Sequence, residues 1–431
     1  MEKDNSKMRI LIVAANALSK TSNNGKTYKS FLKGLSPEQI AQFYTGQNEY
    51  PDNQVCANYY RVTDNEILKS VLNGSLKTKN SHDLLMNSLR TVKLGELKTS
   101  RFKRFLKKHY KYIAPIRDWF WSRRTWDTEE FNKWICEFQP THIFAVLGAQ
   151  DSLHEIARTI SLRYEIPLNV YFTDDYIINA PKDNILDKYK LSNIKKQYEN
   201  TLKLAKDAFV IGAKMRDAYK LRFNRQFGIL INGINFDQRK KNIRKRIKEN
   251  ESVIISFIGG IHLERWKSIV KLGTILNQIE NLQVTLQVFC VSKPEDHILI
   301  EFEKAGVKYC GGLTAEQVDE EIKRSHILLH VESFDVLNRQ YTHYSISTKI
   351  PEYMASMRGI IAYGPYEIAS IQIFRDNKIG CVLTDLDDDV KIRLKLIEYI
   401  YSYNELDFDK QYEYARQHFN QNKMLLKDLL K

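Results

Sequence analysis

The residues of this 431-residue chain whose types and spacing best suit chemistry lie in its second half and would bind an anion. In SISTKIPEYMASMRGIIAYG (345–364), Ser347, Thr348 and Lys349 stand where a helix is predicted to begin. Free N–H groups, the helix dipole and a lysine together favour an anionic ligand at such a position. Glu352, further into the helix, could accept two hydrogen bonds from vicinal hydroxyls such as those of a ribose. Simple capping by Ser or Thr beside a surface glutamate is the alternative.

A second group of residues lies about 90 positions earlier, in FIGGIHLERWKSIVKL (257–272). A predicted strand ends at Gly259 and Gly260, and Arg265 and Lys267 follow at the start of the next predicted helix. An arginine and a lysine two positions apart, beside a glycine turn, can bind one side of a diphosphate while the Thr-Lys pair of the first group binds the other. Alone, this pattern is common on protein surfaces.

Several other catalytic and metal-binding motifs are missing from the sequence. It contains no G-x-x-x-x-G-K-[ST], and no G-x-G-x-x-G follows the first predicted strand, which weighs against P-loop NTPases and dinucleotide-dependent oxidoreductases. No H-E-x-x-H or G-x-S-x-G occurs and the histidines do not cluster, so neither a metal site nor an α/β-hydrolase is expected. The five cysteines are scattered without a C-x-x-C pair, which predicts reduced thiols: Cys56, Cys136, Cys290, Cys310 and Cys381.

The elements expected to position these residues alternate between strands and helices. MRILIVAANALS (8–19) predicts a buried strand, and a polar loop at 21–26 leads from it into an amphipathic helix. Continuous apolar strands alternating with helices are typical of parallel sheets covered on both faces. Further strands are predicted at 141–148, 167–175, 207–212, 227–234, 253–260, 282–290, 307–313, 326–331, 359–364 and 380–385.

Two successive alternating halves predict an α/β fold with two Rossmann-like domains that face each other across a cleft. We expect a first domain at 1–235, a basic linker at 236–252 and a second domain at 253–386. The last segment, 387–431, reads as helices that pack back toward the first domain. Ligands of such sheets bind beyond the carboxyl ends of the strands.

Together the two groups of residues resemble those of the GT-B glycosyltransferases, and the sequence is similar to glycosyltransferase family 4. The resemblance extends over nearly the whole chain. MRILIVAANALSKTSNNGKTYKSFLKGL resembles the family's opening strand and acceptor-side loop, and ILINGIN resembles its Asn-Gly element at the interdomain hinge. FIGGIHLERWKS and SISTKIPEYMASMRGIIAYG resemble the segments that bind the sugar nucleotide.

The resemblance assigns roles to individual residues of the donor site. Arg265 and Lys267 would neutralise the donor diphosphate, and Glu352 matches the second glutamate of the family's Glu-x7-Glu pair, which contacts the ribose. Tyr344 stands where the first glutamate belongs. Glu332 has similar neighbours but lies 20 residues before Glu352, so the first glutamate is either displaced by an insertion or missing.

The family's activity is the transfer of a sugar, with retention, from a nucleoside-diphosphate sugar without a bound metal. By this resemblance the donor would be a UDP- or GDP-sugar, no cofactor would be needed, and the acceptor would be a lipid-linked or oligosaccharide glycan in surface-polysaccharide assembly. On the acceptor side we expect the loop residues Asn24, Gly25 and Lys26. Asp174 and Asp175, at the end of a predicted strand, either orient an acceptor hydroxyl or cap a turn.

The net charge of +14 predicts a polyanionic partner, and most of it comes from one segment. Residues 93–126 hold eleven basic residues against two acidic ones, with aromatic and aliphatic residues at helical spacing on the opposite face. A basic amphipathic helix beside tryptophans is typical of an interfacial membrane segment, although a helix packed on its own domain is the alternative. The proposed contacts are Lys103, Arg104, Lys107, Lys108, Trp119 and Trp121.

The charge distribution therefore favours an anionic membrane surface over nucleic acid, for which no recognised binding module is present. The N-terminus lacks the pattern of a signal peptide, so we expect a cytoplasmic protein, peripheral on the inner face of the membrane. Two other classes stay open. The displaced glutamate motivates a catalytically silent scaffold that binds glycan or partner enzymes, and the basic charge motivates a nucleic-acid-binding protein.

Overall fold

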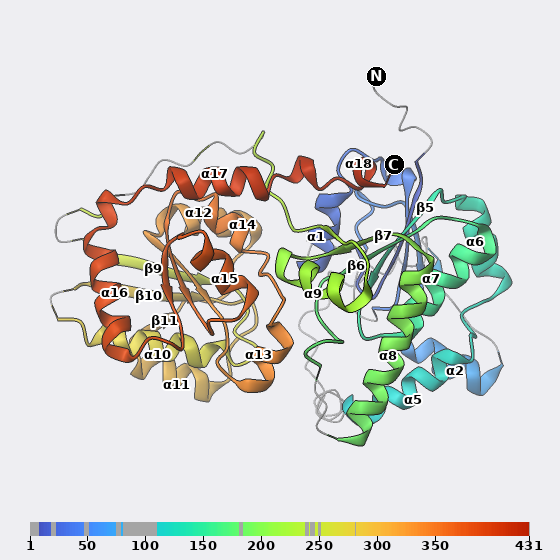
Figure 1. Cartoon of the computed structure of the whole chain (residues 1–431), viewed down its shortest axis with the longest axis horizontal. Coiled ribbons are helices and arrows are strands. Elements are labelled where there is room, and N and C mark those ends of the chain that lie inside the picture. The colour runs from blue at the N-terminus through green and yellow to red at the C-terminus, as the bar shows by residue number, and fades with distance from the viewer. Residues whose placement is uncertain are drawn as a thin grey trace. The chain divides into compact units, whose positions relative to one another are not determined.

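The computed structural model describes residues 8–18, 23–46, 51–74, 79–80, 110–180, 184–237, 241, 246–248, 251–280 and 282–430. The chain divides into two compact units, each built around its own sheet (Figure 1). The first comprises Met1–Ile231 and Met424–Lys431, and the second comprises Asn232–Lys423.

The first unit has seven parallel strands and one short antiparallel edge strand, in the order β4-β3-β2-β1-β5-β6-β7-β8. The strands are β1 Ile10–Ala14, β2 Ile40–Tyr44, β3 Asn58–Arg61, β4 Lys79–Asn80, β5 His142–Leu147, β6 Leu168–Phe172, β7 Ala205–Val210 and β8 Gly228–Ile229. The helices are α1 Asn23–Phe31, η2 Pro37–Gln39, α2 Asp64–Asn73, α5 Tyr110–Ser122, α6 Glu129–Phe138, α7 Asp151–Tyr164, α8 Ile185–Leu204, α9 Ala213–Phe223 and α18 Leu426–Leu429.

The second unit has six parallel strands in the order β11-β10-β9-β12-β13-β14, and Figure 1 shows α12 and α14 on the opposite side of the sheet from α10 and α11. The strands are β9 Val253–Ile258, β10 Val284–Phe289, β11 Val307–Tyr309, β12 Ile327–Val331, β13 Gly359–Tyr363 and β14 Cys381–Leu383. The helices are α10 Arg265–Asn277, α11 Asp296–Lys304, α12 Ala315–Arg324, α13 Val336–Thr342, α14 Ile350–Met354, α15 Ala369–Asp376, α16 Asp389–Tyr401, η3 Tyr403–Glu405, α17 Asp409–His418 and η4 Gln421–Lys423.

Counting parallel strands only, both sheets have the strand order of a Rossmann fold, in which the first strand lies between the second and the fourth. In the first unit β1 pairs with β2 and β5, and in the second β9 pairs with β10 and β12. In the second sheet, the connections that follow β9 and β12 run toward opposite edges of the sheet. This arrangement opens a crevice at the carboxyl ends of these two strands. The two residue groups singled out in the sequence belong to segments around this point.

Strand prediction succeeded where a run of apolar residues is buried on both faces. All five residues of β1 and most of β9 are buried. The short strands β2 and β3 were missed because they carry polar residues. Gln42 of β2 is fully buried, where it accepts a hydrogen bond from the Leu18 amide (2.7 Å) and donates one to the Asn16 carbonyl (2.9 Å).

The final helices contribute to different cores. Ile392 and Leu396 of α16 lie in the core of the second unit. Leu426 of α18 and the adjacent Leu430 lie in the core of the first, which also contains Phe31 of α1. The segment after η3 therefore carries the chain from the second unit back into the first.

The ILINGIN segment lies beside the segment before α18. Ile234 bridges to Asn420, and its amide and carbonyl bond the Phe419 carbonyl (2.7 Å) and the Gln421 amide (2.9 Å). A Cβ on Gly233 would lie 2.6 Å from the Cα of Gln421, so only glycine allows this approach.

We expect Gly233→Ala to lower the stability of the chain by about 1–3 kcal/mol, because the new methyl group meets backbone rather than a movable side chain. Chemical denaturation followed by circular dichroism measures the change. Gly259→Ala is the matched control, since its Cβ would only touch the ring of Phe257 at 3.4 Å. A Gly233→Ala midpoint equal to that of the unsubstituted chain would refute the close approach.

Candidate functional site

An ion pair between Arg265 and Glu332 lies at the switch point of the second sheet. Arg265 is the first residue of α10 and Glu332 follows the last residue of β12. The guanidinium donates to Oε2 of Glu332 through Nε (3.1 Å) and Nη2 (2.8 Å). Glu332 is 2% exposed, and its Oε1 accepts a hydrogen bond from Ser370 Oγ (3.0 Å). Both carboxylate oxygens are thus occupied.

The surroundings of this pair leave part of the arginine available to a ligand. Among the residues that the structure describes, none is bonded to Nη1 of Arg265, and 18% of the side chain stays exposed. His330 lies next to the pair, with its Nε2 3.5 Å from Oε1 of Glu332. Burial lowers the pKa of His330 to about 4, so the imidazole is neutral at pH 7. One arginine and one glutamate therefore set the charge of the cluster.

The turn before α10 has an unusual backbone. Leu263 and Glu264 both have a positive φ, at 57° and 58°, a conformation that costs a residue with a side chain about 1–2 kcal/mol. Lys267, in the first turn of α10, has its Nζ 2.7 Å from Oε2 of Glu264. The lysine predicted to bind a diphosphate is therefore held by a neighbouring carboxylate, but its side chain remains 56% exposed.

The predicted anion-binding helix is shorter than expected. It begins at Ile350 rather than at Ser347, and α14 has five residues, too few for a developed helix dipole. Ser347 Oγ accepts a hydrogen bond from the Lys349 amide (3.3 Å). Lys349 Nζ lies 2.7 Å from Oε2 of Glu352, and each side chain is 28% exposed. The ammonium group of Lys349, more than the helix end, is the feature of this segment that suits an anion.

The structure joins the two residue groups through a residue that the sequence did not single out. Tyr353, buried in α14, places its hydroxyl against the last residue of β9, where it accepts from the Ile258 amide (3.2 Å) and donates to the Ile258 carbonyl (3.3 Å). Gly259 and Gly260 follow directly, and the carbonyl of Thr348 accepts a hydrogen bond from Asn232 Nδ2 at 3.4 Å. Strand pattern and capping signals predict neither this contact nor the roles of His330 and Ser370.

The candidate acceptor-side residues are placed differently from expectation. Asn24, Gly25 and Lys26 belong to the first turn of α1, not to a loop. Asp175 is 3% exposed and caps the turn after β6, accepting hydrogen bonds from several amides and from Tyr219 (3.0 Å). Of the two alternatives, the turn-capping role therefore holds for Asp175, and an acceptor role for it was wrong. Asp174 is partly exposed and accepts from Thr173 Oγ1 (3.0 Å).

A further acidic side chain, which the sequence analysis did not single out, lies just after the end of β5. Asp151 is the first residue of α7. Burial, with a smaller contribution from the charge of Asp118, raises the pKa of Asp151 to about 6. Carboxyls with such raised pKa values concentrate at functional sites, although structural networks raise them too.

The predicted membrane contacts divide in the structure. Lys103, Arg104, Lys107 and Lys108 lie outside the described residues. Trp121 is 2% exposed and donates from Nε1 to Asp64 (2.7 Å), so its assignment to a membrane surface was wrong. Trp119 is 49% exposed, with the Arg123 guanidinium 4.4 Å from its ring centre.

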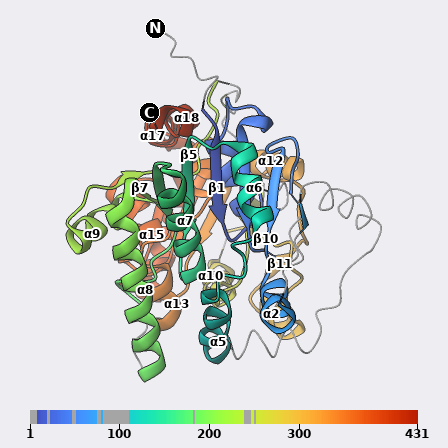
Figure 2. The ribbon, with the colours of Figure 1, turned by 90° about the vertical axis from the view of Figure 1, so that its right-hand side faces the viewer.

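A second set of exposed apolar side chains lies at the start of α8. Ile185 is 84% exposed and Tyr189 60%. Figure 2 shows this end of α8 near α5, and Lys190 of α8 lies close enough to Asp118 of α5 to interact with its charge. No helix among the described residues is long and apolar enough to cross a membrane, and no cluster of three or more His, Cys, Asp or Glu residues there could hold a metal ion.

Comparison with known proteins shows the fold. No family model matches the sequence, and no curated protein matches it. A glycosyltransferase structure from Rickettsia africae is 13% identical, with 98% of this chain and 97% of that chain covered and a TM-score of 0.56. A UDP-forming trehalose-phosphate synthase from Burkholderia xenovorans, in complex with glucose-6-phosphate, is 8% identical, with 98% and 99% covered and a TM-score of 0.56.

An Escherichia coli structure described as trehalose-6-phosphate bound with UDP-2-fluoro glucose gives a similar result, at 10% identity, 98% coverage of both chains and a TM-score of 0.56. At such identities the likeness concerns the fold alone. The predicted α/β fold class is confirmed: this chain has the two Rossmann-like domains of the GT-B architecture. The cleft between the domains stays a prediction.

Proposed function

We propose that this protein is a glycosyltransferase that transfers a sugar, with retention, from a UDP- or GDP-sugar to a glycan acceptor. The observation that carries the proposal is the partly open Arg265 at the switch point of the second Rossmann sheet, next to Lys267. The GT-B fold, shared with a structure named as a glycosyltransferase and with a UDP-forming trehalose-phosphate synthase, supports it. So does the resemblance of the two nucleotide-binding segments to glycosyltransferase family 4.

The transfer step needs stabilisation of the negative charge that develops on the departing diphosphate. Nη1 of Arg265 and the ammonium group of Lys267 supply it in our proposal. To reach a phosphate, Lys267 exchanges its contact with Glu264, and an exposed ion pair of this kind contributes only about 0–1 kcal/mol. Because these two side chains neutralise the diphosphate, we propose a metal-independent reaction, for which unchanged turnover in EDTA is the check.

Glu332 acts in this proposal as a positioning residue for Arg265. Its two oxygens already accept hydrogen bonds from Arg265 and Ser370, which hold the guanidinium in place. Breaking a buried ion pair costs about 3–5 kcal/mol. Glu352, with Lys349 as its partner, is exposed enough to bind the ribose hydroxyls, and Tyr353 holds its segment against β9.

Replacing the cations should weaken donor binding. We expect Lys267→Met to raise the Kd for UDP or GDP about tenfold or more, because one charge-assisted contact is lost. The pair substitution Arg265→Met with Glu332→Leu should weaken binding further without leaving a buried charge unpaired. Isothermal titration measures both, and Lys304→Met, on the exposed face of α11, is the control.

Two outcomes would contradict this prediction. A folded protein that binds none of a panel of UDP-, GDP- and CMP-sugars lacks the proposed donor site. Nucleotide binding without turnover, unchanged by Glu352→Ala, would instead favour the catalytically silent scaffold that binds glycan or partner enzymes.

On the acceptor side, we propose that Asp151 orients the incoming hydroxyl in place of Asp175. The pKa of its carboxyl is about 6, so the group is mostly charged at pH 7. The charged form accepts the hydrogen bond from the hydroxyl, so this role is complete only at pH values well above 6. Asn24, Gly25, Lys26 and Asp174 remain proposed neighbours of the acceptor.

The pH profile of transfer tests this role. We expect kcat/KM to fall as the pH drops through about 6, where Asp151 becomes protonated, and Asp151→Asn to lower the rate and remove this step from the profile. Asp207→Asn, on the partly exposed side of β7, is the control. A profile that keeps its step near pH 6 in Asp151→Asn would show that another group titrates.

We also propose that the protein binds the inner face of the cell membrane peripherally, where a lipid-linked acceptor in surface-polysaccharide assembly would be presented. Exposed Trp119 and Ile116 on α5 and exposed Ile185 and Tyr189 on α8 supply apolar contacts. The basic segment before α5 supplies charge, at about 1 kcal/mol for each Lys or Arg near an anionic leaflet.

Co-sedimentation with vesicles tests the membrane proposal. We expect Ile185→Asp, and separately reversal of Lys103, Arg104, Lys107 and Lys108 to Glu, to reduce binding to phosphatidylserine vesicles severalfold. Leu221→Asp, on the 86% exposed side chain of α9, is the control. Unchanged co-sedimentation would remove these residues from the contact. A salt-dependent affinity for DNA or RNA that exceeds the affinity for vesicles would favour a nucleic-acid-binding protein.

A further inference from the structure

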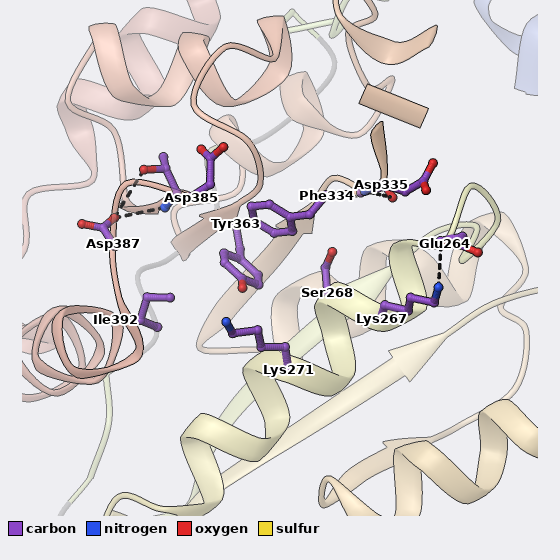
Figure 3. A pocket seen from close by; sticks show the side chains of 12 residues that line it. Glu264, Lys267, Ser268, Lys271, Phe334, Asp335, Tyr363, Asp385, Asp387 and Ile392 are labelled. Atoms are coloured by element: carbon purple, nitrogen blue, oxygen red, sulfur yellow. Dashed lines mark hydrogen bonds and ion pairs between the residues drawn. The ribbon is translucent and has the colours of Figure 1, made fainter. Parts of the chain in front are cut away.

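A cavity of about 490 Å3 lies in the second unit (Figure 3). Its lining residues Glu264 and Ser333 adjoin Arg265 and Glu332 in the sequence. Its walls are α10, the loop after β12, the end of β13 and the loop between β14 and α16. Ser333, which follows Glu332, lines it, as does Ser268, whose hydroxyl donates to the Glu332 carbonyl (2.8 Å). The volume falls within the range of about 300–1,000 Å3 found for small-molecule sites.

The basic side chains of this cavity are already neutralised. Lys271, on the second turn of α10, lies 2.9 Å from Asp389. Lys267, at the edge of the cavity, lies 2.7 Å from Glu264. Lys267 belongs to the proposed donor site at the edge of the cavity, so the interior offers a phosphate only Lys271, against the carboxylates of Asp335, Asp385 and Asp387. A nucleotide diphosphate is therefore a poor ligand for its interior.

The carboxylates are held in fixed positions rather than left to repel one another. Asp385 accepts hydrogen bonds from Arg339 Nη2 (2.9 Å) and from the Tyr366 amide (2.9 Å). Asp387 accepts two from Lys395 Nζ (2.8 Å each). Arg339, Tyr366 and Lys395 lie outside the cavity lining, and the amide of the lining residue Thr384 also donates to Asp387 (3.1 Å). The cavity thus presents well-oriented oxygen atoms whose charge Arg339 and Lys395 offset.

Two aromatic rings complete the cavity. Phe334, partly exposed, packs against Tyr363 with ring centres 4.9 Å apart and planes inclined at 51°. Figure 3 shows the two rings next to each other, with Tyr363 on the side of Lys271. Tyr363 is 2% exposed, and no residue in the described part of the chain bonds its hydroxyl, which lines the cavity. The ring is buried while the hydroxyl is open to the cavity, where a ligand or water can bond it.

We infer that this cavity binds an uncharged saccharide unit that is not part of the nucleotide donor. The C–H face of a sugar ring can pack on Phe334, the Tyr363 hydroxyl can bond one ring substituent, and fixed carboxylates such as Asp385 can accept from vicinal hydroxyls. The inference adds a glycan subsite to the proposed enzyme. Only the assignment of this saccharide to the acceptor chain rests on the proposed function.

Saturation-transfer NMR on the full chain tests the inference with glucose, galactose, N-acetylglucosamine and maltose as probes. UDP, UDP-glucose and spermidine are measured in parallel. We expect at least one free saccharide to bind, and Tyr363→Phe, which removes only the hydroxyl, to weaken it about three- to tenfold. Phe334→Ala should weaken it further. UDP binding should not change, and Tyr401→Phe, 64% exposed on α16, is the matched control.

The inference is overturned if no free saccharide binds, if Tyr363→Phe leaves binding unchanged, or if only spermidine binds. Displacement of the free saccharide by UDP would place the nucleotide in the cavity and overturn the inference. A Tyr363→Phe effect on UDP-glucose alone would assign the cavity to the sugar of the donor, and this result also overturns the inference. Saccharide binding in a protein that binds no nucleotide would support the subsite and refute only the proposed donor site.

Discussion

The ion pair between Arg265 and Glu332 is the constraint on which the second unit's chemistry depends. It connects the start of α10 to the end of β12, the segments that diverge at the switch point of the sheet. Because Glu332 is buried, the pair is stable only with further hydrogen bonds, which Ser370 supplies to the carboxylate. Its position in turn fixes Ser333 and Phe334, which wall the cavity. The proposed donor site and the proposed glycan subsite thus share one buried interaction.

Exposure separates this pair from the other cation–carboxylate contacts of the site. Lys267 with Glu264 and Lys349 with Glu352 are partly or largely open to water, where an ion pair contributes little and a phosphate or ribose can replace one partner. The unliganded site is therefore nearly neutral, which reduces the repulsion between its cations. A ligand would change the exposed contacts and leave the buried pair in place.

The two Rossmann-like sheets could be predicted from the sequence because runs such as VIISFI and ILIVA are buried on both faces, a pattern that depends only on local composition. The start of α10 near Arg265 was predictable because a helix follows the strand and its glycine turn in such alternating folds. The contact of Arg265 with Glu332 was not, since 67 residues separate them and strand order decides their meeting.

Local patterns also failed where a polar or aromatic side chain has a buried partner. Asp175 and Trp121 are residue types that are common in binding sites and on surfaces. In the structure, Asp175 bonds Tyr219 and Trp121 bonds Asp64, and both are buried inside the first unit. The exposed start of α8 gave no signal because its helix carries no strongly apolar face. Tyr363 reads as an ordinary strand residue, and its free hydroxyl emerges only from the packing of Phe334 and α10 around it.

A crystal of the protein soaked with UDP and, separately, with GDP tests the central claim most directly. The account predicts one of these diphosphates within hydrogen-bonding distance of Arg265 and Lys267, with Lys267 released from Glu264 and the Arg265–Glu332 pair intact. A nucleotide bound elsewhere in the second unit, or none at saturating concentration, would contradict it.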